Sequence, residues 1–325
     1  MTAERPTVFI TDYAWPDLEI ERQVIEGAGY RLVAGPATPA PAAQIEALVE
    51  EHRPAGILTN WAPVSAKAVG LSPNLRIVAR LGVGLDNIAV DEATRRGIWV
   101  TNVPDYCFEE VADHSVGMLL SFTRGLMHFD REVKAGRWEP STARLRRLRS
   151  MTVGILGYGR IGRSTAQKLN GFGARVLAYT RSPKTEQGVE FVPLDQLLRE
   201  SDALIVHIPL TPQTKHLLDR ERLASMKKGA IIVNVSRGAV IDTEALIEAL
   251  RSGHIGGAAL DVLENEPNVP AGLLELPNVM LTPHIAFTSD ASLRELRTWA
   301  SEEVVRVLQG KPPKEGRNKP AVRQG

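Results

Sequence analysis

The chain of 325 residues carries 39 Lys and Arg against 38 Asp and Glu, so its net charge of +1 offers no uniform field to hold a nucleic acid or an anionic membrane. Hydrophobic residues make up 43% and charged residues 24%, the balance of a globular protein long enough for two domains. The single cysteine, Cys107, excludes an internal disulfide framework and a multi-cysteine zinc site, and no metal site is expected. Acidic residues interrupt the N-terminal sequence, which has no signal-peptide pattern, so we expect a cytoplasmic protein without a nucleic-acid or membrane partner.

Short β-branched runs alternate with helical patterns from residue 7 to residue 102. The runs are TVFI, YRLVA, AGILTN, RIVARL and GIWVTN. Five strands with helices between them predict a parallel sheet. The residues at or just past the carboxyl ends of these runs are polar, namely Asp12, Asn60, Arg80 and Asn102. Open α/β sheets bind ligands at that edge, so we expect it to face a ligand.

A long helical pattern from about residue 109 to residue 136 and an Arg-rich stretch lead into a second series of strands. The runs are TVGILG, RVLAYT, ALIVHIP, AIIVNVS, IGGAALDV and VMLTPHI. A last helical pattern covers residues 289–308, and a polar, proline-containing sequence follows it. We predict two doubly wound parallel-sheet α/β domains. Residues 1–102 plus 285–310 form the first domain, residues 103–284 form the second, and residues 311–325 form a flexible tail.

The segment GILGYGRIG places Gly157, Gly159 and Gly162 in G-x-G-x-x-G spacing, directly after a strand and at the start of a helix. The first glycine permits a tight turn, the second lets backbone amides reach a pyrophosphate, and the third lets helix and strand pack closely. The helix N-terminus stabilises the anion. The pattern, in this context, predicts a dinucleotide-binding site.

The end of the next strand indicates which dinucleotide is bound. NAD sites usually carry Asp or Glu there to accept hydrogen bonds from the ribose, whereas this chain has Thr180, Arg181 and Ser182. No carboxylate repels a 2′-phosphate, and Arg181 can pair with it. We therefore expect NADP, with NAD as the alternative if Arg181 is only a solvent-exposed side chain.

Three further segments end buried strands in polar residues: IIVNVSRGAVID, GAALDVLENEP and NVMLTPHIAF. Their carboxyl ends should bring Arg237, Asp261, Glu266 and His284 to the same crevice as the glycine-rich turn. Together with GILGYGRIG, VHIPLTPQT and RLGVGLDN, they resemble the D-isomer-specific 2-hydroxyacid dehydrogenases. That family includes glyoxylate/hydroxypyruvate reductases, phosphoglycerate dehydrogenases and the C-terminal-binding-protein branch. The resemblance runs from about residue 7 to residue 310, nearly the whole chain.

The chemistry of that family requires the residue types found here. Arg237 offers a planar fork that can hold a substrate carboxylate through two oxygens. His284 suits a proton donor to the carbonyl oxygen, on which charge builds as the nicotinamide delivers hydride. Glu266 would fix the histidine tautomer and favour the imidazolium. Glu264, in the same LENEP segment, is expected to be a solvated acid.

The resemblance also implies a flavodoxin-like substrate domain, a Rossmann dinucleotide domain and the remaining site residues. The segment after Asn102 resembles the family's dimerisation region, so we expect a homodimer. Arg80 stands just ahead of the substrate loop and would contact a second anionic group or pair with a neighbouring acid. The other implied contacts are Arg160 and Ile161 at the pyrophosphate, Ile208, Pro209 and Thr214 along the adenine and ribose, Val235 and Ser236 at the nicotinamide ribose, Asp261 at the nicotinamide amide with Arg237 and His284 beside the ring, and Val83 and Gly84 at the substrate carboxylate.

Reduction of a small 2-keto acid, such as glyoxylate or hydroxypyruvate, to the D-hydroxy acid is the leading hypothesis. The segments NVPDYCFEEVADH and RLGVGLDN also resemble the C-terminal-binding-protein branch, in which the dinucleotide fold serves as a regulated scaffold. Phosphoglycerate dehydrogenase and phosphite oxidation are further alternatives. Assays with a panel of 2-keto acids would separate an enzyme from a scaffold.

Overall fold

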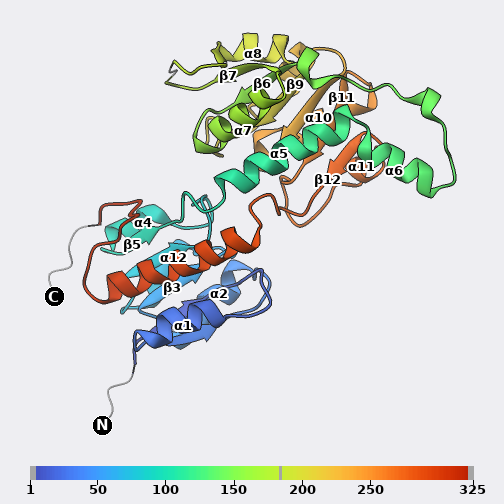
Figure 1. Cartoon of the computed structure of the whole chain (residues 1–325). Helices are drawn as coiled ribbons and strands as arrows, with labels where there is room; N and C mark the ends of the chain where they lie inside the picture. Colours follow the sequence, from blue (N-terminus) through green and yellow to red (C-terminus); the bar gives the residue numbers. More distant parts are fainter. Residues whose placement is uncertain (1–4, 183–184, 321–325) are drawn as a thin grey trace. The chain divides into compact units, whose positions relative to one another are not determined.

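A computed structural model describes residues 5–182 and 185–320 of the chain. The chain forms two compact units, which are described separately below (Figure 1). Unit 1 contains the residues up to Tyr106 and those from Ser289 onward, and unit 2 is Cys107–Thr288. The predicted boundaries, after residues 102 and 284, lie four residues earlier along the chain at both crossings.

Unit 1 contains a five-stranded parallel sheet in the order β2-β1-β3-β4-β5. Its strands are β1 (Thr7–Ile10), β2 (Arg31–Ala34), β3 (Gly56–Thr59), β4 (Ile77–Arg80) and β5 (Trp99–Thr101). All five coincide with predicted runs. The central strands are buried on both faces, with Phe9, Ile57 and Val78 fully enclosed, as expected for a parallel sheet covered by helices.

The helices of unit 1 are α1 (Glu19–Gly27), α2 (Ala42–His52), α3 (Ala66–Leu71), α4 (Val90–Arg95) and α12 (Asp290–Leu308). Helix α12 begins at a capping box formed by Ser289 and Ser292, and it packs against α1, β3 and β4 (Figure 1). Arg297 of α12 is buried and bonds to Glu21 of α1 at 2.8 Å. The last helix of the chain therefore packs on the first sheet.

Residues 311–320 do not form the flexible tail that was predicted. They are ordered and lie along β5. Gly316 forms an antiparallel bridge with Thr101, and the Arg317 N–H donates to the Val100 carbonyl at 2.8 Å. The Asn318 amide accepts from the Val100 N–H at 2.9 Å. Low hydrophobicity suggested disorder, but backbone pairing at the open edge of the sheet orders this segment. Residues 321–325 lie outside the described residues.

Unit 2 contains a seven-stranded parallel sheet in the order β12-β11-β10-β9-β6-β7-β8. The order reverses between β6 and β9, which is the topological switch point where such sheets bind ligands. The strands are β6 (Thr152–Leu156), β7 (Arg175–Tyr179), β8 (Glu190–Phe191), β9 (Ala203–Val206), β10 (Ala230–Asn234), β11 (Ile255–Leu260) and β12 (Val279–Leu281). The sequence predicted six of these strands and missed the two-residue β8.

The helical pattern at 109–136 forms two helices instead of one. Helix α5 (Phe108–Thr123) ends before Gly125, whose φ of +62° is left-handed, and α6 (Leu126–Lys134) follows. The remaining helices are α7 (Arg160–Gly171), α8 (Leu194–Glu200), α9 (Arg220–Ser225), α10 (Thr243–Arg251) and α11 (Ala271–Leu274), with single turns η1 (Pro140–Thr142), η2 (Leu148–Ser150) and η3 (Gly238–Val240).

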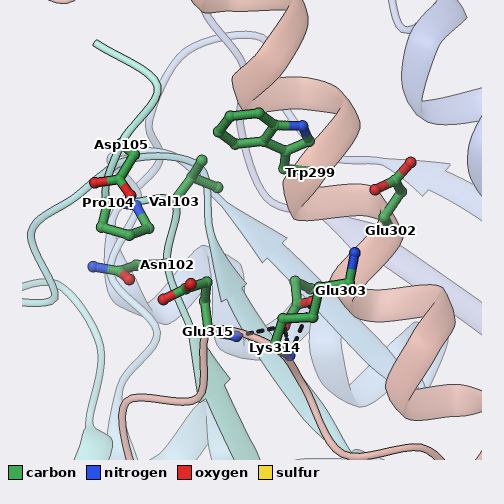
Figure 2. Close-up of a pocket in the computed structure, with 9 residues that line it drawn as sticks. All are labelled: Asn102, Val103, Pro104, Asp105, Trp299, Glu302, Glu303, Lys314 and Glu315. Atoms are coloured by element: carbon green, nitrogen blue, oxygen red, sulfur yellow. Dashed lines mark hydrogen bonds between the residues drawn. The ribbon is translucent and has the colours of Figure 1, made fainter. Parts of the chain in front are cut away.

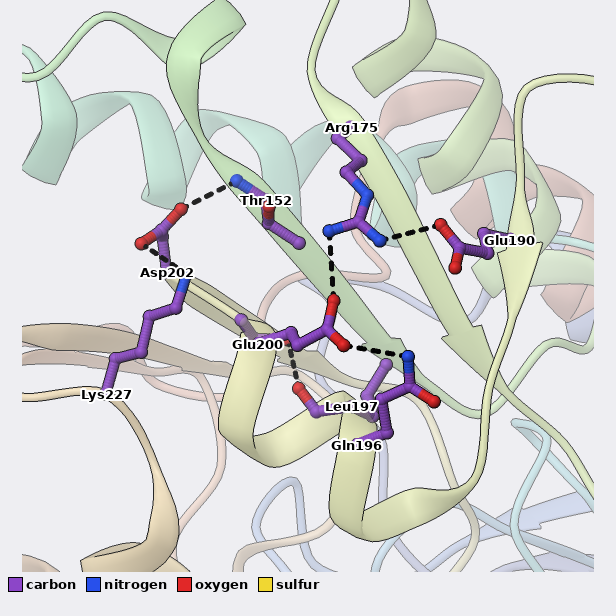
Figure 3. A network of polar contacts seen from close by, with 9 residues as sticks. Thr152, Arg175, Glu190, Gln196, Leu197, Glu200, Asp202 and Lys227 are labelled. Atoms are coloured by element: carbon purple, nitrogen blue, oxygen red, sulfur yellow. Dashed lines mark hydrogen bonds and ion pairs between the residues drawn. The ribbon is translucent and has the colours of Figure 1, made fainter.

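A network of charged side chains covers the amino ends of the unit 2 strands (Figure 3). Arg175, the first residue of β7, pairs with Glu190 at 2.8 Å and with Glu200 at 3.0 Å. Asp202, just before β9, accepts from the Thr152 N–H at 2.8 Å and from Lys227 at 3.1 Å. Because this edge is opposite the carboxyl ends of the strands, the network belongs to the scaffold and not to the ligand site.

Across the described residues, the structure contains no helix with the length and apolar character needed to span a bilayer.

Candidate functional site

The glycine-rich turn between β6 and α7 has the backbone geometry that a dinucleotide requires. Gly157 has a φ of +104°, and a Cβ on it would lie 2.8 Å from Ile208 Cγ2. A Cβ on Gly162 would lie 2.2 Å from the Gly157 carbonyl oxygen. Among the described residues, no atom beyond its chain neighbours lies within 4 Å of a Cβ built on Gly159, and no side chain caps α7. This open space at a helix N-terminus fits the pyrophosphate of a dinucleotide.

The residues on either side of this turn are accessible to a ligand. Arg160 and Ile161 form the first turn of α7, and Arg160 is exposed. Thr180, Arg181 and Ser182 follow β7 directly, with the last two exposed. The end of β7 therefore presents a cation and hydroxyl groups where NAD sites usually present a carboxylate.

The segment after β9 is held by the hydroxyl group of Thr214. This hydroxyl donates to the Pro209 carbonyl at 2.7 Å and accepts from the Thr211 N–H at 2.7 Å. Thr214 thus fixes the conformation of the loop that begins with Ile208 and Pro209. Its hydroxyl is used within the loop, so a contact between Thr214 and a cofactor stays a prediction.

His207 directly follows β9, beside the glycine-rich turn, and its ring is neutral. Its Nε2 lies 3.0 Å from the Thr165 hydroxyl of α7. Burial lowers the pKa of His207 to about 3, so the ring is neutral at physiological pH. His207 therefore joins β9 to α7 as a packing residue.

Arg237 lies in a turn after β10 that Asn234 organises. The Asn234 amide donates to the Arg237 carbonyl at 3.0 Å and accepts from the Ser236 N–H at 3.1 Å and hydroxyl at 2.9 Å. The guanidinium of Arg237 is half-buried and donates to the Ser236 carbonyl at 2.8 Å. Val235 is buried in the same turn. Asn234 was not among the predicted residues, although a polar residue closing a buried strand ahead of VSR was a usable signal.

Glu266 is positioned by its own loop and by the histidine. Its Oε1 accepts from the Leu263 N–H at 3.0 Å, and its Oε2 lies 2.8 Å from His284 Nδ1. Burial by itself raises the pKa of Glu266, but the hydrogen bond from His284 and the charges of His284 and Arg237 lower it, and the lowering prevails. The carboxylate is therefore ionised at neutral pH and accepts a hydrogen bond from the imidazole of His284.

His284 has a left-handed backbone that fixes the direction of its ring. Its φ is +53°, and its N–H donates to the carbonyls of Asp261 at 2.8 Å and Thr282 at 3.0 Å. Because an ionised Glu266 can only accept, Nδ1 carries a hydrogen, and Nε2 is the ring atom that can exchange a proton with a substrate. About a fifth of the side chain is exposed, at 22%.

Asp261 supports the loop that carries His284. Its carboxylate is buried and accepts from the Thr282 hydroxyl at 2.5 Å and from the N–H groups of Ile285 and Ala286, each at 2.9 Å. Both oxygens are thus bonded within the protein. The structure places Asp261 as a positioning residue, and its contact with a nicotinamide amide stays a prediction.

His114 of α5 is a residue that the sequence did not single out. Its Nε2 lies 3.1 Å from the Thr282 hydroxyl and 3.7 Å from the nearer oxygen of Asp261. His114 therefore contacts the Thr282 hydroxyl, which also bonds to Asp261 in the loop that carries His284. Because 168 residues separate His114 from Thr282 along the chain, no local pattern could have indicated the contact.

The turns that carry Arg237 and Glu266 pack directly against each other. A Cβ on Gly238 would lie 1.9 Å from the carbonyl carbon of Leu263, so only glycine permits this approach. Glu264 is not the solvated acid that was expected, because it bonds to His216 at 2.5 Å and to the Thr243 hydroxyl at 3.0 Å. The charge of Arg237 reaches Glu266, and Glu266 holds His284, so the three predicted catalytic residues are brought together.

The predicted substrate residues of unit 1 form a braced loop after β4. Arg80 is only 7% exposed, and its Nη1 donates to the carbonyls of Leu81 and Thr59 and to the Asn60 amide oxygen. A Cβ on Gly82, whose φ is +151°, would lie 3.0 Å from the same guanidinium. These partners are neutral oxygens, so the predicted pairing with a neighbouring acid is not what the structure records for Nη1.

An anion-binding turn and an acid–base pair at the carboxyl edge of one sheet are what a nicotinamide-dependent dehydrogenase needs. The pyrophosphate and the reacting groups then lie along the same row of strand ends. The geometry of unit 2 defines a protein of that class.

Comparisons with known proteins identify the family. The model for the NAD-binding domain of D-isomer specific 2-hydroxyacid dehydrogenases matches residues 116–286. A glyoxylate reductase from Pyrococcus furiosus is 41% identical over 263 residues, which cover 78% of each chain. Among solved structures, an NADPH-dependent glyoxylate/hydroxypyruvate reductase from Sinorhizobium meliloti, in complex with NADP and malonate, has a TM-score of 0.85 at 33% identity and 99% coverage of both chains. A D-lactate dehydrogenase from Aquifex aeolicus, complexed with NAD and lactic acid, has a TM-score of 0.86 at 28% identity and covers 97% of this chain and all of its own.

The chain belongs to the D-isomer specific 2-hydroxyacid dehydrogenase family. It is an oxidoreductase that transfers a hydride between a nicotinamide cofactor and a 2-hydroxy or 2-keto acid. Both sheets have the parallel α/β architecture that the sequence predicted.

Proposed function

We propose that this enzyme reduces a small 2-keto acid, such as glyoxylate or hydroxypyruvate, to the corresponding 2-hydroxy acid, in the D configuration where the product is chiral. The observation that carries the proposal is the His284–Glu266 pair at 2.8 Å, with the charge of Arg237 acting on Glu266. The names of the similar reductases from Pyrococcus furiosus and Sinorhizobium meliloti support the choice of substrate.

Each unit has its own proposed contacts with the substrate carboxylate. In unit 2 the Arg237 guanidinium provides two parallel donors and full positive charge. In unit 1 the proposed donors are the backbone N–H groups of Val83 and Gly84. Arg80 supports this loop through the hydrogen bonds of its Nη1, and its contact with a second anionic group of a substrate stays a prediction.

His284 moves the proton of the reaction. When bound, the nicotinamide supplies the hydride that adds to the carbonyl carbon of the keto acid. His284 Nε2 donates a proton to the carbonyl oxygen as negative charge builds there, and Glu266 stabilises the imidazolium before transfer. In the oxidation direction, the neutral ring accepts the hydroxyl proton at the same atom.

The cofactor is proposed to be NADP, bound by the residues at the carboxyl edge of unit 2. Support comes from the exposed Arg181 and from the absence of a carboxylate among residues 180–182. The similar Sinorhizobium reductase holds NADP and the similar Aquifex dehydrogenase holds NAD, so NAD is the alternative. The proposed contacts are Gly157, Gly159, Arg160, Ile161 and Gly162 at the pyrophosphate, Thr180, Arg181, Ser182, Ile208, Pro209 and Thr214 at the adenosine, and Val235, Ser236, Arg237, Asp261 and His284 at the nicotinamide riboside.

Steady-state assays with NADPH and NADH and a panel of 2-keto acids test these assignments. We expect turnover with glyoxylate or hydroxypyruvate, and a higher kcat/KM for NADPH than for NADH. An equal kcat/KM or a preference for NADH would reject the cofactor assignment. Tight cofactor binding without turnover of any keto acid would reject the substrate assignment and favour a scaffold.

We propose that the enzyme is a cytoplasmic homodimer. Support for a dimer comes from large apolar side chains exposed on residues 126–145, including Trp138 at 79% and Leu126 at 58%. The single cysteine, Cys107, is buried and free, which accords with a reducing compartment.

A further inference from the structure

The C-terminal segment of unit 1 reaches the substrate loop through a chain of hydrogen bonds. We propose that residues 311–320, named here the C-terminal strap, position the backbone donors of the substrate loop, and that Arg317 is the positioning residue. This inference rests on the proposed function, because it takes Val83 and Gly84 to bind the substrate carboxylate.

The first link is between Arg317 and Asn102. Arg317 Nε donates to the Asn102 amide oxygen at 2.5 Å, and its Nη2 pairs with Glu315 at 2.7 Å. A charged donor on the oxygen of an amide polarises the group and makes its NH₂ a stronger donor. It also fixes which end of the Asn102 side chain faces the strap.

The second link is between Asn102 and the substrate loop. Asn102 Nδ2 donates to the Val83 carbonyl at 2.5 Å, and the Val103 N–H donates to the Gly82 carbonyl at 3.0 Å. Residues 102 and 103 therefore hold two successive carbonyl groups of the loop. Asn102 is 6% exposed, so its donor group has little competition from water.

Because peptide bonds are planar, these contacts also fix the direction of the proposed N–H donors. In a trans peptide the carbonyl and the following N–H point in opposite directions and rotate together. Fixing the Gly82 carbonyl therefore directs the Val83 N–H, and fixing the Val83 carbonyl directs the Gly84 N–H. The Val83 N–H therefore points away from Val103, and the Gly84 N–H points away from the Asn102 side chain.

Polar contacts hold the strap in place, with little apolar burial. Glu303 of α12 accepts from the N–H groups of Lys314 and Glu315 at 2.9 and 3.2 Å (Figure 2). A cavity of about 210 Å³ lies between Asn102, α12 and the strap, and Trp299 lines it. The strap therefore reaches the substrate loop through the bond from Arg317 to Asn102.

The experiment measures kcat, both KM values and the melting temperature for Arg317→Ala and Asn102→Asp. Asn102→Asp keeps an acceptor for Arg317 but removes the donor to Val83. We expect each variant to raise KM for the keto acid about three- to tenfold, the range of one hydrogen bond to a charged or buried group. We expect kcat and KM for the cofactor to stay within about twofold, since neither contact in unit 1 involves the proton donor. Arg317→Lys should recover part of the loss, and Lys319→Ala, which removes an exposed cation from the same strap, should match the wild type.

Two results would overturn the inference. An unchanged KM for the keto acid in Arg317→Ala would show that the strap only covers the edge of β5. An increase in both KM values together with a lower melting temperature would show that Arg317 has a general structural role. If the wild-type enzyme reduces no 2-keto acid, the proposed function fails, and hydrogen exchange at the Val83 and Gly84 amides still tests the strap. Faster exchange in Arg317→Ala supports it, and unchanged exchange contradicts it.

Discussion

At the residue scale, the carboxylate of Glu266 orients His284, the proposed proton donor, through the contact between its Oε2 and His284 Nδ1. Glu266 has a lowered pKa despite its burial, because His284 and Arg237 favour the charged form. A depressed pKa means that the Glu266 carboxylate is charged at neutral pH and becomes protonated only as pH falls below the ordinary glutamate value of 4.5. Any loss of activity above that pH must then arise from another group.

Glu266→Gln tests this residue with little change in shape. The glutamine oxygen can still accept from His284 Nδ1, but the negative charge that favours the imidazolium is gone. We expect kcat for reduction to fall roughly 10- to 1000-fold, less than the roughly 100- to 10,000-fold of general acid catalysis, because His284 itself remains. A variant with the wild-type kcat would show that Glu266 only shapes the loop.

The positions of Arg237, Glu266 and His284 could be predicted because each follows a strand of the unit 2 sheet, and parallel strands bring their carboxyl ends to one edge. The catalytic roles of the three residues stay predictions. The supports of these residues were missed because they depend on long-range contacts. His114 meets Thr282 across 168 residues, and His216 meets Glu264 across 48.

At the scale of elements, the turn into α7 is the part of unit 2 that sequence predicts best. Gly159→Ala separates its binding role from its folding role, because a Cβ there meets no neighbouring described atom within 4 Å. We expect an unchanged melting temperature but a cofactor affinity weakened about tenfold or more, the cost of overfilling a close contact. Gly171→Ala, at the far end of the same helix, is the matched control and should bind cofactor normally. Normal cofactor binding by Gly159→Ala would place the pyrophosphate elsewhere.

The charged network at the amino ends of the unit 2 strands makes a prediction about acid stability. Burial raises the pKa of Asp202, but the Thr152 N–H and Lys227 lower it further, and the net pKa is lowered. Its contribution to folding is therefore present above the unfolded aspartate value and is lost as pH falls through the folded one. We expect Asp202→Asn to cost about 1 kcal/mol at neutral pH and less at pH 3, below the ordinary aspartate value of 3.8, as measured by urea unfolding. An equal cost at both pH values would contradict the account, and Glu50→Gln on the exposed face of α2 serves as control.

Elements were predictable where periodicity and turn residues agreed, as in all five strands of unit 1. The break between α5 and α6 was missed because a single glycine, Gly125, inside an apolar helical pattern is not enough to predict a left-handed turn. The strap was missed because its order comes from the unpaired edge of β5, and composition alone cannot show such a partner.

At the scale of the whole molecule, the apolar surface on residues 126–145 predicts self-association. Trp138→Glu places a charge in that surface, so we expect the dimer to dissociate at concentrations where the wild type stays associated. Light scattering coupled to gel filtration gives the mass directly. Phe172→Glu, another exposed apolar residue of unit 2, is the matched control and should leave the mass unchanged. A wild-type monomer would contradict the prediction.

The central claim is that His284 supplies the proton when a keto acid accepts hydride. The most direct measurement is the single-turnover rate of nicotinamide oxidation by the wild type and by His284→Gln, at saturating cofactor and keto acid. The account predicts a rate about 100- to 10,000-fold lower in the variant, with cofactor affinity nearly intact, because the main role of His284 is proton transfer. A variant that oxidises the nicotinamide at the wild-type rate would contradict it.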